Sequence, residues 1–330
     1  MNTIIRRTVI GAGALLAGIQ ALAALAAEPA GAFPLRPVTI IVANTPGGPV
    51  DIESRLYAGK LGQLLGQPFV LDFKPGAGGT VGSAFVARSA PDGHTLLAVT
   101  AGFTSFPALY RNLPFDTTRD FAPVSLMSQR TSVLLAYPGF APRNFVEYIA
   151  HARANPGRIN HGTTGVGGII HLTGAWMHHA TNTTVTFVHY KGAAAELADL
   201  AAGRIDVAST TLLAAMPLLK SGKVRALGVL NDKRSRLLPD VPTIAEQGIP
   251  EYNYASWLGF VAPGSTPSAT VTRLNEGFAR VAAMPDIAAA LEAEGSVMVG
   301  STAQQFRDII AREIERWRKL VDATGISLEN

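Results

Sequence analysis

Three glycine-rich segments hold the residues best suited to binding chemistry in this sequence, each where a strand is expected to run into a helix. They read TPGGPVD (45–51), PGAGGTVG (75–82) and TTGVGGIIH (163–171). The start of a helix offers unpartnered N–H groups and the positive end of the helix dipole, which suit a phosphate or a carboxylate. Glycine lets such a group approach the backbone closely. One such segment could be an ordinary tight turn, but three in one chain predict an anion-binding site.

The glycine spacing excludes the common nucleotide-binding motifs. Counted from Gly76, the third glycine of a G-x-G-x-x-G pattern falls on Val81. A Walker A motif needs Ser or Thr after Gly-Lys, and Gly59-Lys60 is followed by Leu61. The sequence also has no G-x-S-x-G nucleophile elbow. The pattern therefore favours binding over catalysis.

The histidines do not have the spacing of metal ligands. His178 and His179 are adjacent on an expected helix and point about 100° apart. His171 and His178 share a face but are separated by about 10 Å of helical rise. We expect no metal and no cofactor. His171, at a glycine-rich helix start, could donate to a ligand or be a structural histidine. Asp51 could be a first-turn acid or bind a ligand amine.

The elements that must position these segments alternate along the chain. Apolar strand-like runs alternate with helical-period segments, as in α/β folds. Ligands of open α/β sheets bind in the loops at the carboxyl ends of the strands. The expected strands are 38–43, 68–73, 94–100, 121–128, 132–137, 158–164, 184–190, 204–210, 224–230 and 256–262; the expected helices include 50–65, 144–155, 169–180, 193–202, 212–221, 268–283, 285–294 and 302–324.

The first residues indicate export. Arg6 and Arg7 precede an apolar, alanine-rich run from Thr8 to Ala27, which is typical of a secretory signal peptide and less so of a membrane anchor. We therefore expect residues 1–27 to be removed and the protein to reach the periplasm. The formal net charge is +4, to which the two leader arginines contribute, and no basic run suggests nucleic-acid binding. With no cysteine, stability must come from the core rather than from disulfides.

Several longer stretches resemble one family. They include PLRPVTIIVANTPGGPVD, KPGAGGTVGSAFVARSAPDGHTLL, LPFDTTRDFAPVSLM, VHYKGAAAELADLAAGRIDV, GKVRALGVLNDKRSRLLPDVPTIAEQG and SWLGFVAPGSTP. Their order and content are similar to those of the tripartite tricarboxylate transporter receptors, often called Bug proteins. The resemblance covers nearly all of residues 34–325.

This resemblance implies a type II periplasmic-binding-protein fold, with two α/β domains, a hinge and a ligand cleft between them. Residues 34–130 and 256–330 would form domain I, and 131–255 domain II. It also implies a small carboxylate ligand (a di- or tricarboxylate, an amino acid or an aromatic acid) and a two-component membrane permease as partner. We expect a monomer.

The three glycine segments would face the cleft and supply most of the candidate ligand-binding residues. The full candidate set is Thr45, Pro46, Gly47, Gly48, Asp51, Gly76, Ala77, Gly78, Gly79, Phe103, Thr104, Thr163, Thr164, Gly165, Gly168, His171 and Thr210. The chain departs from the family pattern at Val50, Gly168 and His189, where the family usually has Thr or Ala, Ser, and Pro. These departures change the available hydrogen bonds, so the identity of the ligand does not carry over.

No arginine lies in the three segments. We expect a carboxylate between the helix starts after Gly48 and Gly168, bound by N–H groups and by hydroxyls such as Thr45, Thr163 or Thr164. Valine at Gly48 or Gly78 should block its approach without destabilising the protein, provided that neither glycine has a positive φ. Lys233 and Arg316 are expected on solvated faces.

The function predicted from these observations is non-catalytic capture of a small carboxylate for transport. A receptor that feeds a sensor kinase would have the same features in its own sequence. A periplasmic enzyme acting on a small organic acid through His171 and threonine side chains is a further alternative, although the sequence has no nucleophile–base motif.

Overall fold

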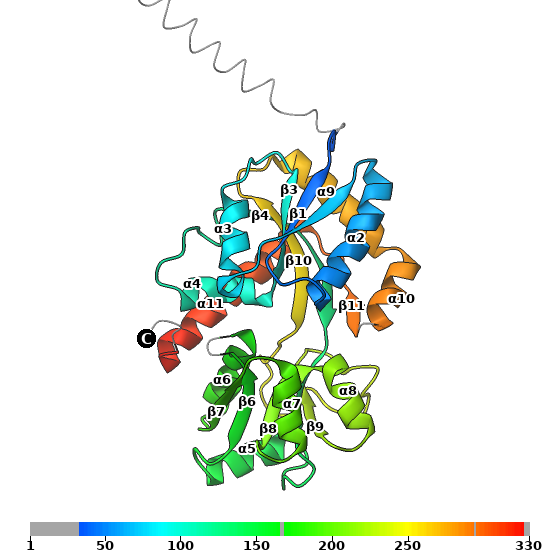
Figure 1. Cartoon of the computed structure of the whole chain (residues 1–330). Coiled ribbons are helices and arrows are strands. Elements are labelled where there is room, and N and C mark those ends of the chain that lie inside the picture. Colours follow the sequence, from blue (N-terminus) through cyan, green and yellow to red (C-terminus); the bar gives the residue numbers. More distant parts are fainter. Residues whose placement is uncertain (1–32, 166–167, 294, 327–330) are drawn as a thin grey trace, which may run out of the picture.

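The computed structural model describes residues 33–165, 168–293 and 295–326. The expected signal peptide, residues 1–27, lies outside the described residues. Within these ranges no helix combines the length and the apolar character needed to cross a membrane. Figure 1 shows two α/β domains, joined by the segments that follow β4 and precede β10.

The first sheet has six strands in the order β11-β4-β10-β3-β1-β2. β1 pairs in parallel with β2 and β3, and β10 pairs antiparallel with β3 and β4. β4 therefore runs in the same direction as β1 to β3, and the carboxyl ends of all four strands meet at one edge. The strands are β1 (Val38–Val42), β2 (Phe69–Phe73), β3 (Thr95–Thr100), β4 (Phe121–Arg130), β10 (Ser256–Pro263) and β11 (Ser296–Met298).

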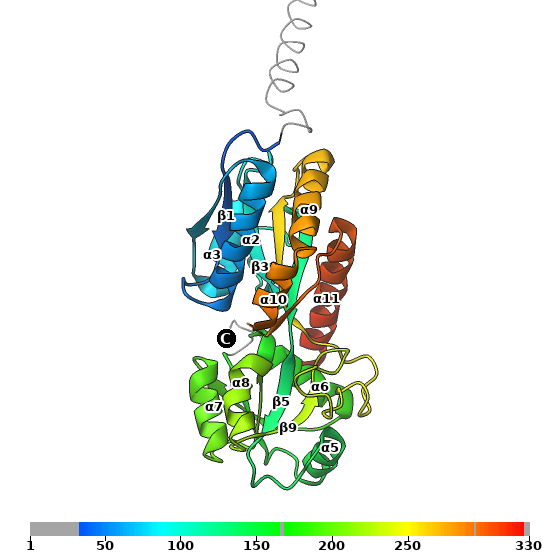
Figure 2. The ribbon, with the colours of Figure 1, turned by 90° about the vertical axis from the view of Figure 1, so that its right-hand side faces the viewer.

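Helices cover both faces of this sheet, as Figure 2 shows for α2 and α9 on one side and α11 on the other. Alternate residues of β1 enter different cores: Ile40 packs in the cluster that includes α2, α9 and α10, and Ile41 in the cluster that includes α11. The helices are α2 (Pro49–Leu65), α3 (Thr80–Ala87), α4 (Phe106–Leu109), α9 (Ser268–Ala282), α10 (Pro285–Ala293) and α11 (Ala303–Thr324), with the 3₁₀ turns η1 (Ala77–Gly79) and η2 (Ala101–Ser105).

The second sheet has five strands in the order β7-β6-β8-β5-β9. β6 is parallel to β7 and β8, whereas β5 is antiparallel to β8 and β9. The carboxyl ends of β6 to β9 therefore lie at the edge where β5 begins. The elements are β5 (Ser132–Ala136), β6 (Asn160–Thr164), β7 (Thr186–Tyr190), β8 (Val207–Thr211), β9 (Arg225–Val229), α5 (Phe145–Ala154), α6 (Ile169–Thr181), α7 (Ala193–Ala201) and α8 (Leu212–Lys220).

The crossing between the sheets brings these two edges together. β4 ends at Arg130 in the first sheet and β5 begins at Ser132 in the second. Because both residues lie at the carboxyl-end edges of their sheets, those edges face each other. The Asn231 side chain secures the crossing: it accepts from the Ser132 N–H at 2.8 Å and donates to the Arg130 carbonyl at 3.2 Å.

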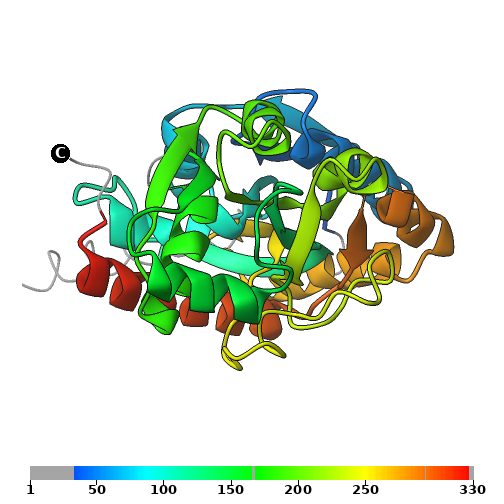
Figure 3. The same cartoon turned by 90° about the horizontal axis from the view of Figure 1, so that it is seen from below.

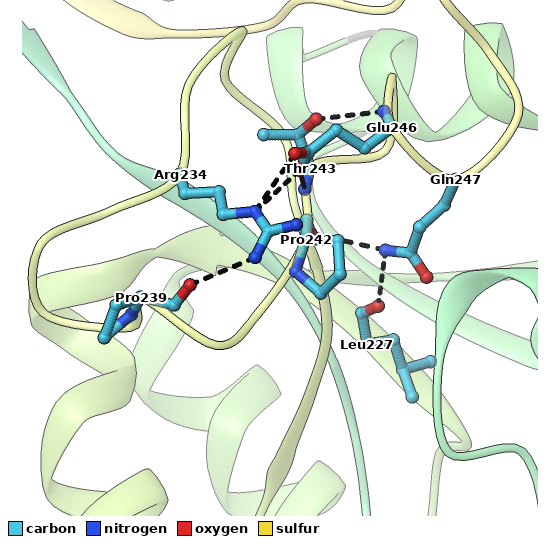
Figure 4. A network of polar contacts seen from close by, with 7 residues as sticks. All are labelled: Leu227, Arg234, Pro239, Pro242, Thr243, Glu246 and Gln247. Carbon is cyan, nitrogen blue, oxygen red and sulfur yellow. Dashed lines mark hydrogen bonds and ion pairs between the residues drawn. The ribbon is translucent and has the colours of Figure 1, made fainter.

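The return path from β9 to β10 contains no named helix or strand, yet side chains hold it in place (Figure 4). Arg234 contacts both Glu246 carboxylate oxygens, at 3.0 and 3.1 Å, and donates to the Pro239 carbonyl. Gln247 donates to the carbonyls of Leu227 and Pro242. These bonds anchor the return segment to the second sheet.

A second contact between the domains is aromatic. Trp176 of α6 stacks on Tyr252, with ring centroids 4.3 Å apart, and Arg316 of α11 lies over the Trp176 ring at 4.3 Å. Trp317 meets Trp176 edge-on at 6.2 Å, and the Tyr252 hydroxyl donates to the Thr173 carbonyl. α11, which is red in Figure 3, contacts α6 of the second domain. α6 is thus held against the last helix of the first domain.

The expectation that Arg316 lies on a solvated face is wrong. Its guanidinium covers the Trp176 ring and donates to the Asn253 carbonyl at 3.0 Å. Burial lowers the pKa of Arg316 from its ordinary value. Sequence periodicity could not show this, because the partner ring belongs to the other domain. Lys233 is exposed, as expected.

We expect Arg316→Ala to lower the free energy of unfolding by about 1–2 kcal/mol, because a partly desolvated cation–π contact and a hydrogen bond are lost. The exposed Lys233→Ala control should change it by less than about 0.5 kcal/mol. Urea unfolding at neutral pH measures both. Equal stabilities for the two variants would show that the Arg316 contact contributes little.

Candidate functional site

The junction between β1 and α2 presents open N–H groups at the edge of the first sheet. Gly48 is the N-cap of α2 and has an extended backbone, with φ −86° and ψ 173°. The first helical hydrogen bond runs from the Ile52 N–H to the Gly48 carbonyl at 3.1 Å. Pro49 has no N–H, so Val50 and Asp51 supply the donors of the first turn. Thr45 and Pro46, which precede the helix in the chain, are exposed.

The Asp51 side chain is engaged inside this junction. It is 6% exposed, accepts from the Gly47 N–H at 2.8 Å and pairs with Arg55 Nε at 2.6 Å. The carboxylate therefore orders the loop that precedes the helix. Of the two roles considered for Asp51, this geometry favours the structural one over binding a ligand amine.

The second glycine segment is shaped by backbone conformation. Gly76, Ala77, Gly78 and Gly79 have φ values of 137°, 44°, 66° and 105°. Side chains rarely adopt such angles, so the turn depends on its glycines. A Cβ at Gly78 would also lie 3.1 Å from the Tyr110 hydroxyl. Because Gly78 has a positive φ, Gly78→Val would strain the turn and cannot test ligand binding by itself. Gly48 has a negative φ and allows this test.

The third segment starts α6 at the edge of the second sheet. Gly168 is the N-cap, and the first helical bond runs from the Leu172 N–H to the Gly168 carbonyl at 3.0 Å. The N–H groups of residues 169–171 are therefore the first-turn donors. Gly165 has a φ of 78° and donates its N–H to the Tyr190 carbonyl at 3.0 Å. Thr164 is half-buried beside it.

Thr163 and His171 lie beneath this helix start. The Thr163 hydroxyl is buried and bonded to His189 Nδ1 at 2.9 Å. His171 is 7% exposed, and its ring packs edge-on against Phe187 and His189, at centroid distances of 4.7 and 4.8 Å. Burial, with a smaller effect of His189, lowers the pKa of His171 to about 4. His171 is therefore neutral near pH 7.

Behind this segment lies a buried histidine pair that periodicity in the sequence did not reveal. His161 Nδ1 is 3.1 Å from His178 Nε2, and His178 also contacts the Tyr148 and Thr183 hydroxyls. Burial lowers the pKa of His178 to about 4 and that of His161 well below its usual value. Both rings are thus uncharged core groups. Across the described residues, no set of three His, Cys, Asp or Glu side chains could hold a metal ion.

Comparison with known proteins identifies the family. A family model described as the tripartite tricarboxylate transporter family receptor matches residues 54–326. The chain belongs to this family. The resemblance found in the sequence is thereby confirmed, and the receptor is similar over its whole length to protein BugT of Bordetella pertussis, at 32% identity over 331 residues and 100% of both chains.

Solved relatives of the receptor confirm the two-domain periplasmic-binding fold. The structure described as R. palustris Rpa4515 with adipate is 34% identical, covers 90% of this chain and 100% of its own, and has a TM-score of 0.75. MatC (Rpa3494) from Rhodopseudomonas palustris with bound malate is 30% identical, covers 88% of this chain and 100% of its own, and has a TM-score of 0.72. The family is one of periplasmic binding receptors rather than enzymes.

Three candidate residues of the receptor lie in its interior rather than in the glycine segments. Phe103 packs edge-on against Phe106 and Phe121. The Thr104 hydroxyl donates to the Ala101 carbonyl at 2.7 Å, lies 3.0 Å from a Glu313 carboxylate oxygen and accepts from the Trp317 indole. Thr210 is buried in β8, opposite Val133 of β5. These contacts give Phe103 and Thr104 a packing role.

Proposed function

We propose that this receptor captures a small carboxylate between its two domains and delivers it to the membrane subunits of a tripartite tricarboxylate transporter. The observation that carries the proposal is the opposition of two helix starts. α2 and α6 begin at the facing carboxyl-end edges of the two sheets, and the first turn of each has N–H groups free of helical bonds. Such groups bind a carboxylate without any charged side chain.

The strength of binding follows from the number of these bonds. A hydrogen bond to a charged group contributes about 1.5–3 kcal/mol net. Two or three at each helix start, less the cost of ordering ligand and loops, support micromolar affinity. The solved relatives hold adipate and malate, which are small acids with two carboxylates each.

We propose domain boundaries at the two crossings. Domain I would comprise residues 34–130 and 256–330, and domain II residues 131–255. The sheet memberships of β4, β5 and β10 support this division. Closure of the two domains around the hinge at Thr131 would exclude water from the bound acid.

The proposal is tested with the receptor purified from its native host. Native mass spectrometry should show a bound organic acid, and calorimetry with that acid should give one site per chain. A panel of free acids with adipate, malate, glutamate and benzoate would then define the class. Retention of a neutral or cationic molecule, with no affinity for any acid, would contradict the proposal.

We further expect export to the periplasm with cleavage near residues 26–28, because a charged start, an apolar run and small residues precede this point. The intact mass of receptor released by osmotic shock checks this. A mass that still includes residues 1–24 would be inconsistent with removal of a signal peptide.

A further inference from the structure

Arg130 brings a buried cation to the place where the two domains meet. It is the last residue of β4, 8% exposed, and pairs in the first sheet with Ser256 of β10 and Ser296 of β11. The chain crosses to the second sheet immediately after it. A charged side chain is rarely buried unless a partner holds it.

The partner is Glu53 of α2, which is 1% exposed. Arg130 Nη2 donates to Glu53 Oε1, and the Ser296 hydroxyl donates to the same oxygen at 2.7 Å. The Ser128 hydroxyl donates to the other carboxylate oxygen. With both of its oxygens bonded, the carboxylate fixes the guanidinium in one position.

The partner Glu53 is itself close to the open end of α2. Glu53 lies three residues after Val50, which corresponds to a rise of about 4.5 Å along the helix. A guanidinium has five N–H donors in a planar fork. In the described part of the chain, the side-chain hydrogen bond of Arg130 is the one to Glu53, so donors remain for a further acceptor.

We propose that Arg130 binds the ligand carboxylate held at the start of α2, with Glu53 as the residue that positions it. This inference rests on the proposed function, since it names the side-chain cation of the same site. The three glycine segments contain no arginine, and Arg130 supplies the planar fork that they lack. A carboxylate bridging the α2 N–H groups and Arg130 would also join the first domain to the crossing at Thr131.

Two variants separate ligand binding from a purely structural ion pair. Glu53→Gln keeps the guanidinium and a carbonyl to hold it but leaves the buried charge of Arg130 without its counter-ion, so the empty variant should unfold more easily than the wild type. Because the competing negative charge is gone, the folded variant should bind an acid at least as tightly as the wild type. The double variant Glu53→Gln/Arg130→Met removes the pair without leaving a buried charge, and should bind at least about tenfold more weakly. Calorimetry with adipate, malate, glutamate and benzoate provides the readout.

A matched control removes another ion pair from the same helix. Lys60 of α2 pairs with Asp286 of α10 at 2.7 Å. Lys60→Met/Asp286→Asn should leave affinity unchanged. Arg130→Lys, which keeps a cation opposite Glu53 and so favours folding, should bind several-fold more weakly because the planar fork is lost.

The outcomes are distinct. Wild-type affinity in the folded double variant, or in Arg130→Lys, would overturn the role of Arg130 and leave the proposed function standing. If Glu53→Gln weakens binding of the acid as much as the double variant does, the loss comes from breaking the ion pair. The role of Arg130 in binding would then be overturned as well. If the wild type retains no acid from its host and binds none of the panel, the proposed function and this inference fail together.

Discussion

Replacing Gly48 with valine should abolish binding of the carboxylate while leaving the empty receptor about as stable as the wild type. Gly48 has a φ of −86°, which valine adopts, and an added Cβ meets nothing closer than the Thr45 carbonyl at 3.8 Å. The new side chain would stand before the N–H groups of Val50 and Asp51. Loss of two charge-assisted bonds, at about 1.5–3 kcal/mol each, corresponds to at least a hundredfold loss of affinity.

The matched control is Gly59→Val. Gly59 lies on the same helix, is exposed, and a Cβ there would meet nothing within 4 Å. It should bind as the wild type does. Calorimetry with the acid retained on purification compares the two, and thermal unfolding without ligand confirms that both fold. Equal affinity in Gly48→Val and Gly59→Val would remove the start of α2 from the site.

Replacing Glu196 should produce the largest change in stability. Glu196 of α7 is fully buried, and in the part of the chain that the structure describes neither carboxyl oxygen has a hydrogen-bond partner. It packs on β6, where a Cβ added at Gly162 would lie 3.3 Å from its Oε1. Burial raises the pKa of Glu196 from 4.5 to about 8.

The direction of the pH effect follows from this shift. Because the folded state binds the proton more tightly than the unfolded state, the contribution to stability is greatest below pH 4.5. It falls as the pH rises towards 8 and is level above that. The shift corresponds to a loss on the order of 5 kcal/mol across this range.

We expect Glu196→Gln to remove most of this pH dependence, and Glu196→Leu to raise the free energy of unfolding at pH 8.5 by about 2–4 kcal/mol. Urea unfolding at pH 5 and pH 8.5 provides the measurement. Burial raises the pKa of Glu313 to about 7, so its titration acts in the same direction and only the difference between variant and wild type isolates Glu196. Glu251→Gln makes the same change at an exposed position. If the free energy of unfolding of Glu196→Gln changes between pH 5 and pH 8.5 as much as that of the wild type, the account is contradicted.

The sequence predicted the strand-to-helix junctions well, because the residues that mark them are adjacent in the chain. Glycine before a helical period and apolar runs of strand length identified the starts of α2 and α6. The three-residue strand β11 gave no such signal, since Ser296–Met298 is too short to show a period. The positive φ of Ala77 was equally invisible, because alanine gives no indication of such a conformation.

Side-chain roles were harder to predict, because they depend on contacts between distant segments. Thr104 appeared suited to ligand binding, but α11 places Glu313 and Trp317 on its hydroxyl. Arg130 ends an apolar strand, and no sequence pattern around it indicates that its partner is Glu53, which is 77 residues away. Only the way α2 packs across the sheet brings Glu53 to the end of β4, which is three strands away from β1 in the sheet order.

A crystal structure of the receptor with the acid that it retains from its native host tests the central claim most directly. We predict one carboxylate between the two domains, with its oxygens within hydrogen-bond distance of the Val50 and Asp51 N–H groups and of the first turn of α6. An acid bound at a surface remote from both helix starts, or a ligand without a carboxylate, would contradict the account.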